Sequence, residues 1–242
     1  MSQSTRVAIV TGASRGLGDV IARVLAVHGH DLVIGGRDER ALAAAADDLR
    51  TIGGRIATVP GDVADPAVQA AFIDEARAMG GLQVLVNNAS ELGGMRPVAD
   101  VRTEDLDRLF LVNVGAPVAL IRRATPLLKK SGGLVVNISS DAARGGYPGW
   151  GAYGATKAAL DLLTLTLDAE LRADGIHAVS VDPGDMRTRM HQEAFAGQDI
   201  SDRPLPEITI PFWNWLFHQD AASIGGERFA AQQEDERWLQ RV

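Results

Sequence analysis

Short runs of apolar, mostly β-branched residues alternate along the chain with longer runs that are rich in alanine and leucine. The short runs predict strands at residues 6–10, 31–35, 55–59, 82–87, 133–138 and 177–182. The longer runs predict helices at 16–28, 38–52, 66–79, 103–130 and 153–173. Because the strand candidates are apolar at nearly every position, they suit parallel strands buried on both faces. This alternation predicts an α/β fold, a doubly wound parallel sheet of βαβ units with helices on both faces.

Local signals refine these boundaries. Pro66 stands where a first-turn proline is tolerated, directly after Asp65 as a candidate N-cap. In the long segment 103–130, Pro117 marks the candidate point of interruption. The last fifty residues break the alternation: 185–217 is rich in aromatic residues and proline, and a short strand is expected at 227–231.

Composition narrows the class of protein. With 242 residues and 46% hydrophobic residues, the chain can bury a core, and we expect a single domain over 1–242. The absence of cysteine excludes disulfides and thiolate metal sites, and five histidines show no metal-ligand spacing. A net charge of −7 argues against a general affinity for nucleic acid. No long apolar run or signal-type N-terminus is present, so we expect a cytoplasmic protein without a membrane segment.

A glycine-rich turn follows the first predicted strand and precedes the first helix, with the sequence Thr-Gly-Ala-Ser-Arg-Gly-Leu-Gly over residues 11–18. Glycines there allow the backbone to approach a pyrophosphate, and the helix N-terminus offers N–H donors. We predict nucleotide contacts from Gly12, Ser14, Arg15, Gly16, Leu17 and Gly18. An ordinary tight turn is the alternative, since the spacing is not that of the G-x-G-x-x-G fingerprint.

The end of the second strand bears on the choice of cofactor. An acidic residue there would favour NAD, whereas arginine accommodates the 2′-phosphate of NADP. The chain has Gly35, Gly36 and Arg37 at this point, and Arg15 approaches from the glycine turn. We therefore predict NADP(H). In the alternative reading, Arg37 is a solvated loop residue.

The ends of the third and fourth strands carry further polar candidates. Asp62 and Val63 follow the third strand, and Asp62 either accepts from an adenine amino group or caps a helix. Asn87, Asn88 and Ala89 follow the fourth strand, and the asparagines are expected to tie neighbouring loops together. Ligands bind at this edge of open α/β sheets, so both segments are predicted to lie beside the cofactor.

Tyr153 and Lys157 lie four residues apart at the start of the last long helix, so they share a helix face. A nearby ammonium favours a phenolate, which allows the phenol to exchange protons near neutral pH. The chain has two tyrosines and three lysines, and only Tyr153 has a lysine at this spacing. Ser139 and Ser140 end the preceding strand.

The order of these motifs resembles the short-chain dehydrogenase/reductase family over roughly residues 5–190. The motifs are T-G-x-x-x-G-x-G, N-N-A, a helix asparagine, a serine, Y-x-x-x-K and P-G-x-x-x-T. The resemblance implies a Rossmann-type domain of about seven parallel strands that forms a dimer or tetramer. It assigns Ser140, Tyr153, Lys157 and Asn113 to catalysis, and Pro183, Gly184, Met186 and Thr188 to cofactor contacts. Two departures are Ser90, where the family usually has glycine, and a C-terminus without the usual D-G-G.

These features together predict an NADP(H)-dependent carbonyl reductase or alcohol dehydrogenase. Tyr153 would protonate the substrate oxygen, Ser140 would hold it, Lys157 would lower the Tyr153 pKa and bind the ribose, and Asn113 would anchor a water. Aromatic residues in the expected substrate lid, 185–217, suit a hydrophobic or ring-bearing substrate, or else they pack against the core or a partner subunit. Alternative functions are a non-catalytic NADP-binding sensor and, with less support, a methyltransferase.

Overall fold

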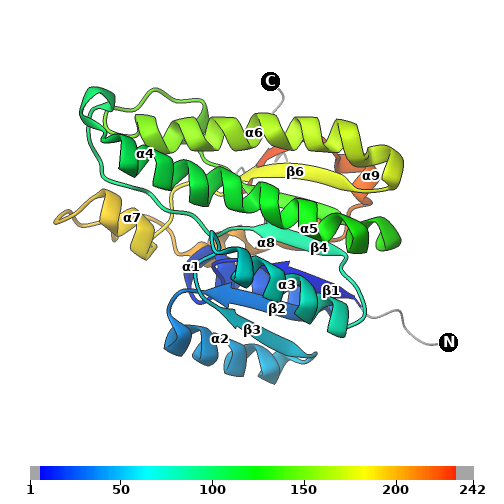
Figure 1. Ribbon diagram of the computed structural model, residues 1–242. Helices are drawn as coiled ribbons and strands as arrows, with labels where there is room; N and C mark the ends of the chain where they lie inside the picture. The colour runs from blue at the N-terminus through cyan, green and yellow to red at the C-terminus, as the bar shows by residue number, and fades with distance from the viewer. Residues whose placement is uncertain (1–5, 233–242) are drawn as a thin grey trace.

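The computed structural model describes residues 6–232, which form one parallel sheet flanked by helices on both faces (Figure 1). Within these residues the sheet has seven strands in the order β3-β2-β1-β4-β5-β6-β7. The strands are β1 (Val7–Val10), β2 (Asp31–Gly36), β3 (Ile56–Pro60), β4 (Val84–Asn87), β5 (Leu134–Ile138), β6 (His177–Asp182) and β7 (Arg228–Ala230). The predicted doubly wound fold is confirmed.

The two faces of the sheet bury separate apolar cores. One core packs under α1 (Gly16–Val27), α2 (Glu39–Ile52) and α8 (Ile210–Leu216), and the other under α3 (Pro66–Ala78), α5 (Ala116–Ser131) and part of α6 (Gly151–Leu171). Alternate residues of β1 enter opposite cores, as the two-residue period of a strand requires. The edge strand β3 is the exception to burial on both faces, since only Val59 of its residues is buried.

The segment predicted as one helix over 103–130 contains a break. It comprises α4 (Thr103–Phe110), a π-helical turn (Leu111–Gly115) and α5. The break lies next to Pro117, as the sequence predicts, because the proline has no N–H to donate to the carbonyl of Asn113 four residues earlier. The predicted start of α3 is confirmed: the Asp65 carboxylate accepts from the backbone N–H of Ala67 at 2.8 Å.

The C-terminal region contributes buried residues to the core and also adds short helices outside it. It contains α7 (Arg189–Ala194), a 3₁₀ turn (Pro206–Thr209), α8, α9 (Ala221–Ile224) and β7. Phe212 and Trp213 are fully buried on α8, where they pack with Phe229 of β7 in the α1 core. Phe212 and Trp213 therefore pack against the core, which was one of the two roles considered for the aromatic residues of 185–217. No helix within 6–232 is both long and apolar enough to cross a membrane.

Candidate active site

A cleft of about 1060 Å³ runs along the carboxyl ends of the strands. The order of the strands reverses between β1 and β4, and open α/β sheets bind ligands at such a reversal. Segments far apart in the sequence meet there: the 11–18 turn, the ends of β2, β3, β4 and β5, the first turns of α6, and the 183–190 loop.

Close packing explains the glycines of the 11–18 turn. A Cβ on Gly18 would lie 2.3 Å from the carbonyl oxygen of Gly12, and one on Gly12 would lie 2.9 Å from Ala89 Cα. Gly12 and Gly16 also have positive φ, 68° and 60°. No side chain caps the N-terminus of α1, so its N–H groups are available to an anion in the cleft.

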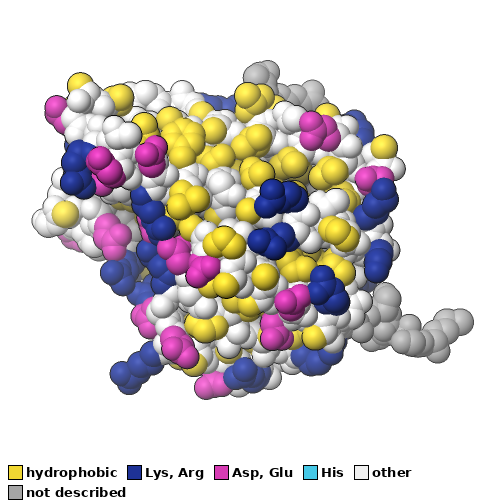
Figure 2. Space-filling model, in the orientation of Figure 1, with side chains coloured by type: hydrophobic (Ala, Val, Ile, Leu, Met, Phe, Trp, Pro, Cys, Tyr) yellow, Lys and Arg dark blue, Asp and Glu magenta, His cyan; other side chains and the backbone are white. Residues whose placement is uncertain are grey.

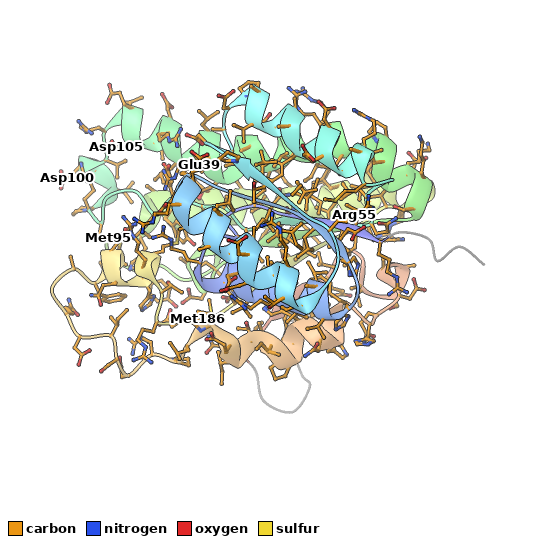
Figure 3. The ribbon with its side chains drawn as sticks, turned by 90° about the horizontal axis from the view of Figure 1, so that it is seen from below. Glu39, Arg55, Met95, Asp100, Asp105 and Met186 are labelled. Carbon is orange, nitrogen blue, oxygen red and sulfur yellow. The ribbon has the colours of Figure 1, made fainter. Side chains whose placement is uncertain are left out.

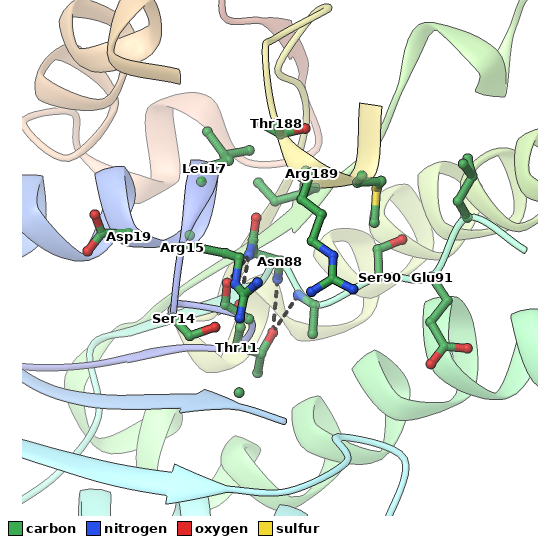
Figure 4. A pocket seen from close by; sticks show the side chains of 18 of the residues that line it. Thr11, Ser14, Arg15, Leu17, Asp19, Asn88, Ser90, Glu91, Thr188 and Arg189 are labelled. Atoms are coloured by element: carbon green, nitrogen blue, oxygen red, sulfur yellow. Dashed lines mark hydrogen bonds between the residues drawn. The ribbon is translucent and has the colours of Figure 1, made fainter. Parts of the chain in front are cut away.

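Asn88 joins the loops that follow β1 and β4. Its amide nitrogen donates to the carbonyls of Thr11 (2.9 Å) and Gly12 (3.1 Å). The Thr11 hydroxyl accepts from the backbone N–H groups of Asn88 and Ala89, each at 3.0 Å (Figure 4). Asn87 bonds Asn137 of β5 at 2.8 Å. The expected loop-tying role is confirmed for Asn88, whereas Asn87 joins strands β4 and β5 through its side chain.

The two arginines expected at the ribose end are both paired with carboxylates. Arg37 Nη1 lies 2.6 Å from Glu91 Oε1, and Arg15 Nη2 lies 2.5 Å from Asp38 Oδ2. Arg37 is 65% exposed at the rim. Figure 4 shows the guanidinium of Arg15 extending into the same part of the cleft as that of Arg189. This end of the cleft is thus rich in cations, each paired with a carboxylate.

Asp62 and Val63 both line the cleft. One carboxylate oxygen of Asp62 accepts from Ala64 N at 2.9 Å, and the other lies 2.6 Å from Arg108. Partial burial opposes ionisation, but these two donors hold the pKa of Asp62 below its usual value. Asp62 therefore closes a local turn, while the cap of α3 is Asp65.

Tyr153 and Lys157 lie in the first two turns of α6, and both are buried. Lys157 Nζ is 5.5 Å from the centroid of the Tyr153 ring and donates to the carbonyl of Ile138 at 2.8 Å. The hydroxyls of Ser140 and Ser90 act on the Tyr153 phenol and favour its ionised form. The end of β5 and the start of α6 thus gather a phenol, an ammonium and two hydroxyls at one point.

Burial shifts both key groups toward their neutral forms. It raises the pKa of Tyr153, while the neighbouring hydroxyls of Ser140 and Ser90 oppose the rise. It also lowers the pKa of Lys157 from 10.5 to about 8, against the attraction of Asp161. Because the folded pKa of Lys157 lies below the unfolded one, charging this lysine destabilises the fold. That cost is full below pH 8 and is relieved as pH rises toward 10.5.

Asn113 lies in the π-helical turn, and its side chain is fully used within the protein. It donates to Glu91 O (2.8 Å) and Thr156 Oγ1 (3.1 Å), and it accepts from Glu91 N (2.8 Å) and Ser90 Oγ (3.0 Å). Asn113 therefore fixes the Ser90–Glu91 segment beside the cleft. Any water that it anchors must bind its backbone carbonyl, because the amide has no free partner position.

The 183–188 loop closes another side of the cleft. Pro183, Met186 and Thr188 line it, whereas Gly184 turns away and donates its N–H to Asp182 at 3.0 Å. Thr188 also caps α7 through a 3.2 Å bond from His191 N. Among the other predicted residues, Ser140 and Asn113 lie behind the lining, in contact with Tyr153 and with Ser90 respectively.

An apolar wall stands over Tyr153. Met95, Trp150, Met190 and Ala194 pack around Leu92, Ala142 and Tyr153. The Trp150 ring lies 5.8 Å from that of Tyr153 and 6.2 Å from that of Phe195. Figure 3 shows Met95 beside α7, with Met186 at the same end of the molecule. Phe195, which follows α7, thus contacts the apolar residues around Tyr153 through Trp150.

Sequence reasoning missed several residues of the cleft. Glu91 was overlooked although it directly follows the N-N-A-S motif, and Arg189 although it follows Thr188. Ser139 was assigned only to the strand end. Its buried hydroxyl lines the cleft and has no hydrogen-bond partner among the described residues. A polar ligand in the cleft would satisfy it, so this orphan oxygen and the uncapped α1 N-terminus fit a bound dinucleotide.

Comparison with known proteins agrees with this geometry. The family model for short chain dehydrogenases matches residues 6–199. An uncharacterized oxidoreductase of Mycobacterium tuberculosis is 36% identical over 209 residues, covering 84% of this chain and 78% of the relative. An NADPH-dependent aldehyde reductase-like chloroplastic protein of Arabidopsis thaliana is 35% identical over 199 residues, covering 76% and 74%.

A solved structure is similar to this chain in both sequence and fold. A blue fluorescent protein from a metagenomic library, in complex with NADPH, is 31% identical and superposes with a TM-score of 0.82, covering 93% of this chain and 95% of its own. The matched span includes the glycine turn, the asparagine loop and the Tyr153–Lys157 pair. The chain therefore belongs to the short-chain dehydrogenase/reductase family of oxidoreductases.

Proposed function

We propose that the protein is an NADP(H)-dependent carbonyl reductase that also oxidises the corresponding secondary alcohol. The observation that carries the proposal is that Tyr153 and Lys157 line one end of a cleft, with Ser140 behind them, and that the glycine turn lines the other end. A dinucleotide along this cleft would reach from the cationic rim to the buried phenol.

In this proposal the residues of the chain have the following roles in binding and proton transfer. The backbone of the 11–18 turn and the α1 N-terminus bind the diphosphate, Arg15 and Arg37 bind the 2′-phosphate, and Lys157 bonds the ribose. When bound, the reduced nicotinamide supplies the hydride that the carbonyl carbon accepts. Tyr153 transfers its proton to the carbonyl oxygen, and Ser140 donates a hydrogen bond to that oxygen. Reprotonation of the phenolate restores the site.

Two features support NADP over NAD. The end of β2 has no acidic residue to accept from a free ribose hydroxyl, since Asp38 belongs to the next turn and caps α2. The similar protein from Arabidopsis thaliana and the similar solved structure are both described with NADPH. A bound 2′-phosphate would replace Glu91 as the partner of Arg37 and Asp38 as the partner of Arg15. Both arginines would then still have a negatively charged partner.

The apolar wall over Tyr153 supports a hydrophobic or aromatic ketone or aldehyde as substrate. Trp150 and Phe195 offer ring faces, and Met95 and Met190 offer adaptable apolar surface. In this proposal 185–217 acts in part as a lid, with α7 over the substrate and α8 anchored in the core. The domain is then a single unit that binds cofactor and substrate together.

Exposed apolar residues support a homodimer or homotetramer. Leu162 and Leu165 of α6 are 66% and 48% exposed, and Phe110, Leu111 and Val118 are exposed nearby. Figure 2 shows apolar side chains gathered over α4, α5 and α6 on this face. A second copy of the chain would cover the patch by an isologous contact.

Single-turnover oxidation of NADPH with a panel of ketones tests the function. Tyr153→Phe keeps the ring and its packing but removes the proton, so the hydride-transfer rate should fall by about 10²–10⁴-fold while NADPH binding is retained. Tyr147→Phe is the matched control, because Tyr147 is half exposed and outside the cleft lining. If Tyr153→Phe reacts at the wild-type rate, Tyr153 is not the acid. Retained NADPH binding with no turnover of any carbonyl by the wild type would favour a sensor.

A further inference from the structure

Arg228 on β7 is a buried arginine that contacts the candidate active site from behind. Its side chain is 6% exposed, and the cleft lining does not include it. Its Nε donates to Asp161 Oδ2 at 2.9 Å, and its Nη2 donates to the carbonyl of Ser140 at 2.8 Å and lies 3.4 Å from Asp182 Oδ2. A guanidinium is the side chain that can make several such bonds in fixed directions.

These contacts join three segments that carry functional groups. Asp161 lies one turn after Lys157 on α6. Ser140 carries a hydroxyl that acts on the Tyr153 phenol. Asp182 ends β6, and its other oxygen accepts from Gly184 N at 3.0 Å at the start of the 183–188 loop. One side chain thus links the serine turn, the lysine helix and the nicotinamide-side loop.

The same guanidinium balances negative charge behind the site. It contacts the carboxylates of Asp161 on α6 and Asp182 on β6. The titratable groups of the adjoining segments are Lys157, one turn before Asp161, and Asp141, which follows Ser140 and bonds Tyr147. Asp182 and Asp141 both raise the pKa of Tyr153, and Asp161 raises that of Lys157. Without the arginine, these carboxylates would act on the phenol and the ammonium unopposed.

We propose that Arg228 is a positioning residue of the site, which holds the backbone of Ser140 against α6 and β6 and neutralises Asp161 and Asp182 behind the Tyr153–Lys157 pair. The proposal rests on the proposed function for its kinetic consequence. Its electrostatic consequence is independent of any substrate.

Lys157 gives the substrate-independent test. The chain has only three lysines, and the other two, Lys129 and Lys130, lie on α5. Carbon-13 labelling of lysine and an NMR pH titration would therefore report Lys157 directly, starting from a pKa of about 8. Arg228→Met should raise this pKa by roughly one unit, because a cation is lost and Asp161 is left unpaired. Arg228→Lys keeps the charge and should leave the pKa near its wild-type value.

Two further variants separate this role from a purely structural one. Asp161→Asn should move the Lys157 pKa downward, opposite to Arg228→Met. Arg172→Met is the matched control: it also breaks an arginine–aspartate pair on α6, with buried Asp168, but at the far end of the helix. It should lower stability and leave the Lys157 pKa unchanged. If Arg228→Met does not fold, Arg228→Gln replaces it in the same comparison.

Kinetics then test the positioning itself. Arg228→Lys should lower the single-turnover rate roughly tenfold or more, with little change in NADPH affinity, because the bond to the Ser140 carbonyl is lost. A folded Arg228→Met or Arg228→Gln with the wild-type Lys157 pKa would overturn the electrostatic proposal. A wild-type rate in Arg228→Lys would overturn the positioning. Absence of turnover in the wild type itself would refute the reductase function and leave the NMR result valid.

Discussion

Replacement of Arg37 by aspartate tests the choice of cofactor at the residue on which it depends. Arg37 stands at the end of β2, 2.6 Å from Glu91 and 65% exposed at the rim of the cleft. Aspartate removes the cation and supplies the acceptor that a free ribose hydroxyl prefers. The variant should therefore bind NADPH more weakly, while its affinity for NADH is kept or improved.

The magnitude follows from the contacts exchanged. A charge-assisted hydrogen bond to a phosphate contributes about 1.5–3 kcal/mol, which corresponds to a roughly 10–150-fold loss of NADPH affinity. Part of this is offset because Arg37 must first leave Glu91. A rim ion pair of this exposure contributes about 0.2–1 kcal/mol, so Glu91→Gln should tighten NADPH binding by roughly 1.5–5-fold. The two substitutions therefore act in opposite directions on the same contact.

Isothermal calorimetry with NADPH and NADH on each variant measures both effects. Arg50→Asp is the matched control, since Arg50 lies on α2 outside the cleft lining and pairs with exposed Asp47. The reasoning is refuted if Arg37→Asp binds NADPH within about twofold of wild type, or if it loses NADH and NADPH equally. The wild type must also prefer NADPH, because equal affinities would show that no residue selects the 2′-phosphate.

Two other substitutions test burial and assembly. Lys157→Met removes a buried ammonium whose pKa is about 8, and it should raise the free energy of unfolding in urea by roughly 1–3 kcal/mol near pH 7. This gain should shrink as pH rises from 8 toward 10.5, and a gain that is constant with pH would contradict the cause given. Leu162→Arg on the exposed face of α6 should reduce the mass measured by light scattering to that of a monomer. A monomeric wild type at micromolar concentration would refute the proposed oligomer.

The sequence predicted the Tyr153–Lys157 pair better than its surroundings. Tyr153 and Lys157 follow from helix periodicity, because residues four apart must share a face. The glycine turn follows from local conformation, since Gly12 and Gly16 adopt positive φ. Burial on both faces was predicted correctly for β1, β4 and β5, and it was wrong at β3, one of the two edge strands, where only Val59 is buried.

Some features depended on contacts between segments that no local pattern encodes. The pairing of Arg37 with Glu91 joins residues 54 apart, and Arg228 meets the carbonyl of Ser140 across 88 residues. The aromatics of α8 were ambiguous in sequence because a lid and a core use the same residue types, and only the packing of Phe212 and Trp213 against α1 and β7 distinguished them. The sequence by itself determined most strands and helices, their order and the shared helix face of Tyr153 and Lys157, since these follow from periodicity and backbone preference. The tertiary structure decided which charges face each other, because partners in an ion pair are selected by distance in space.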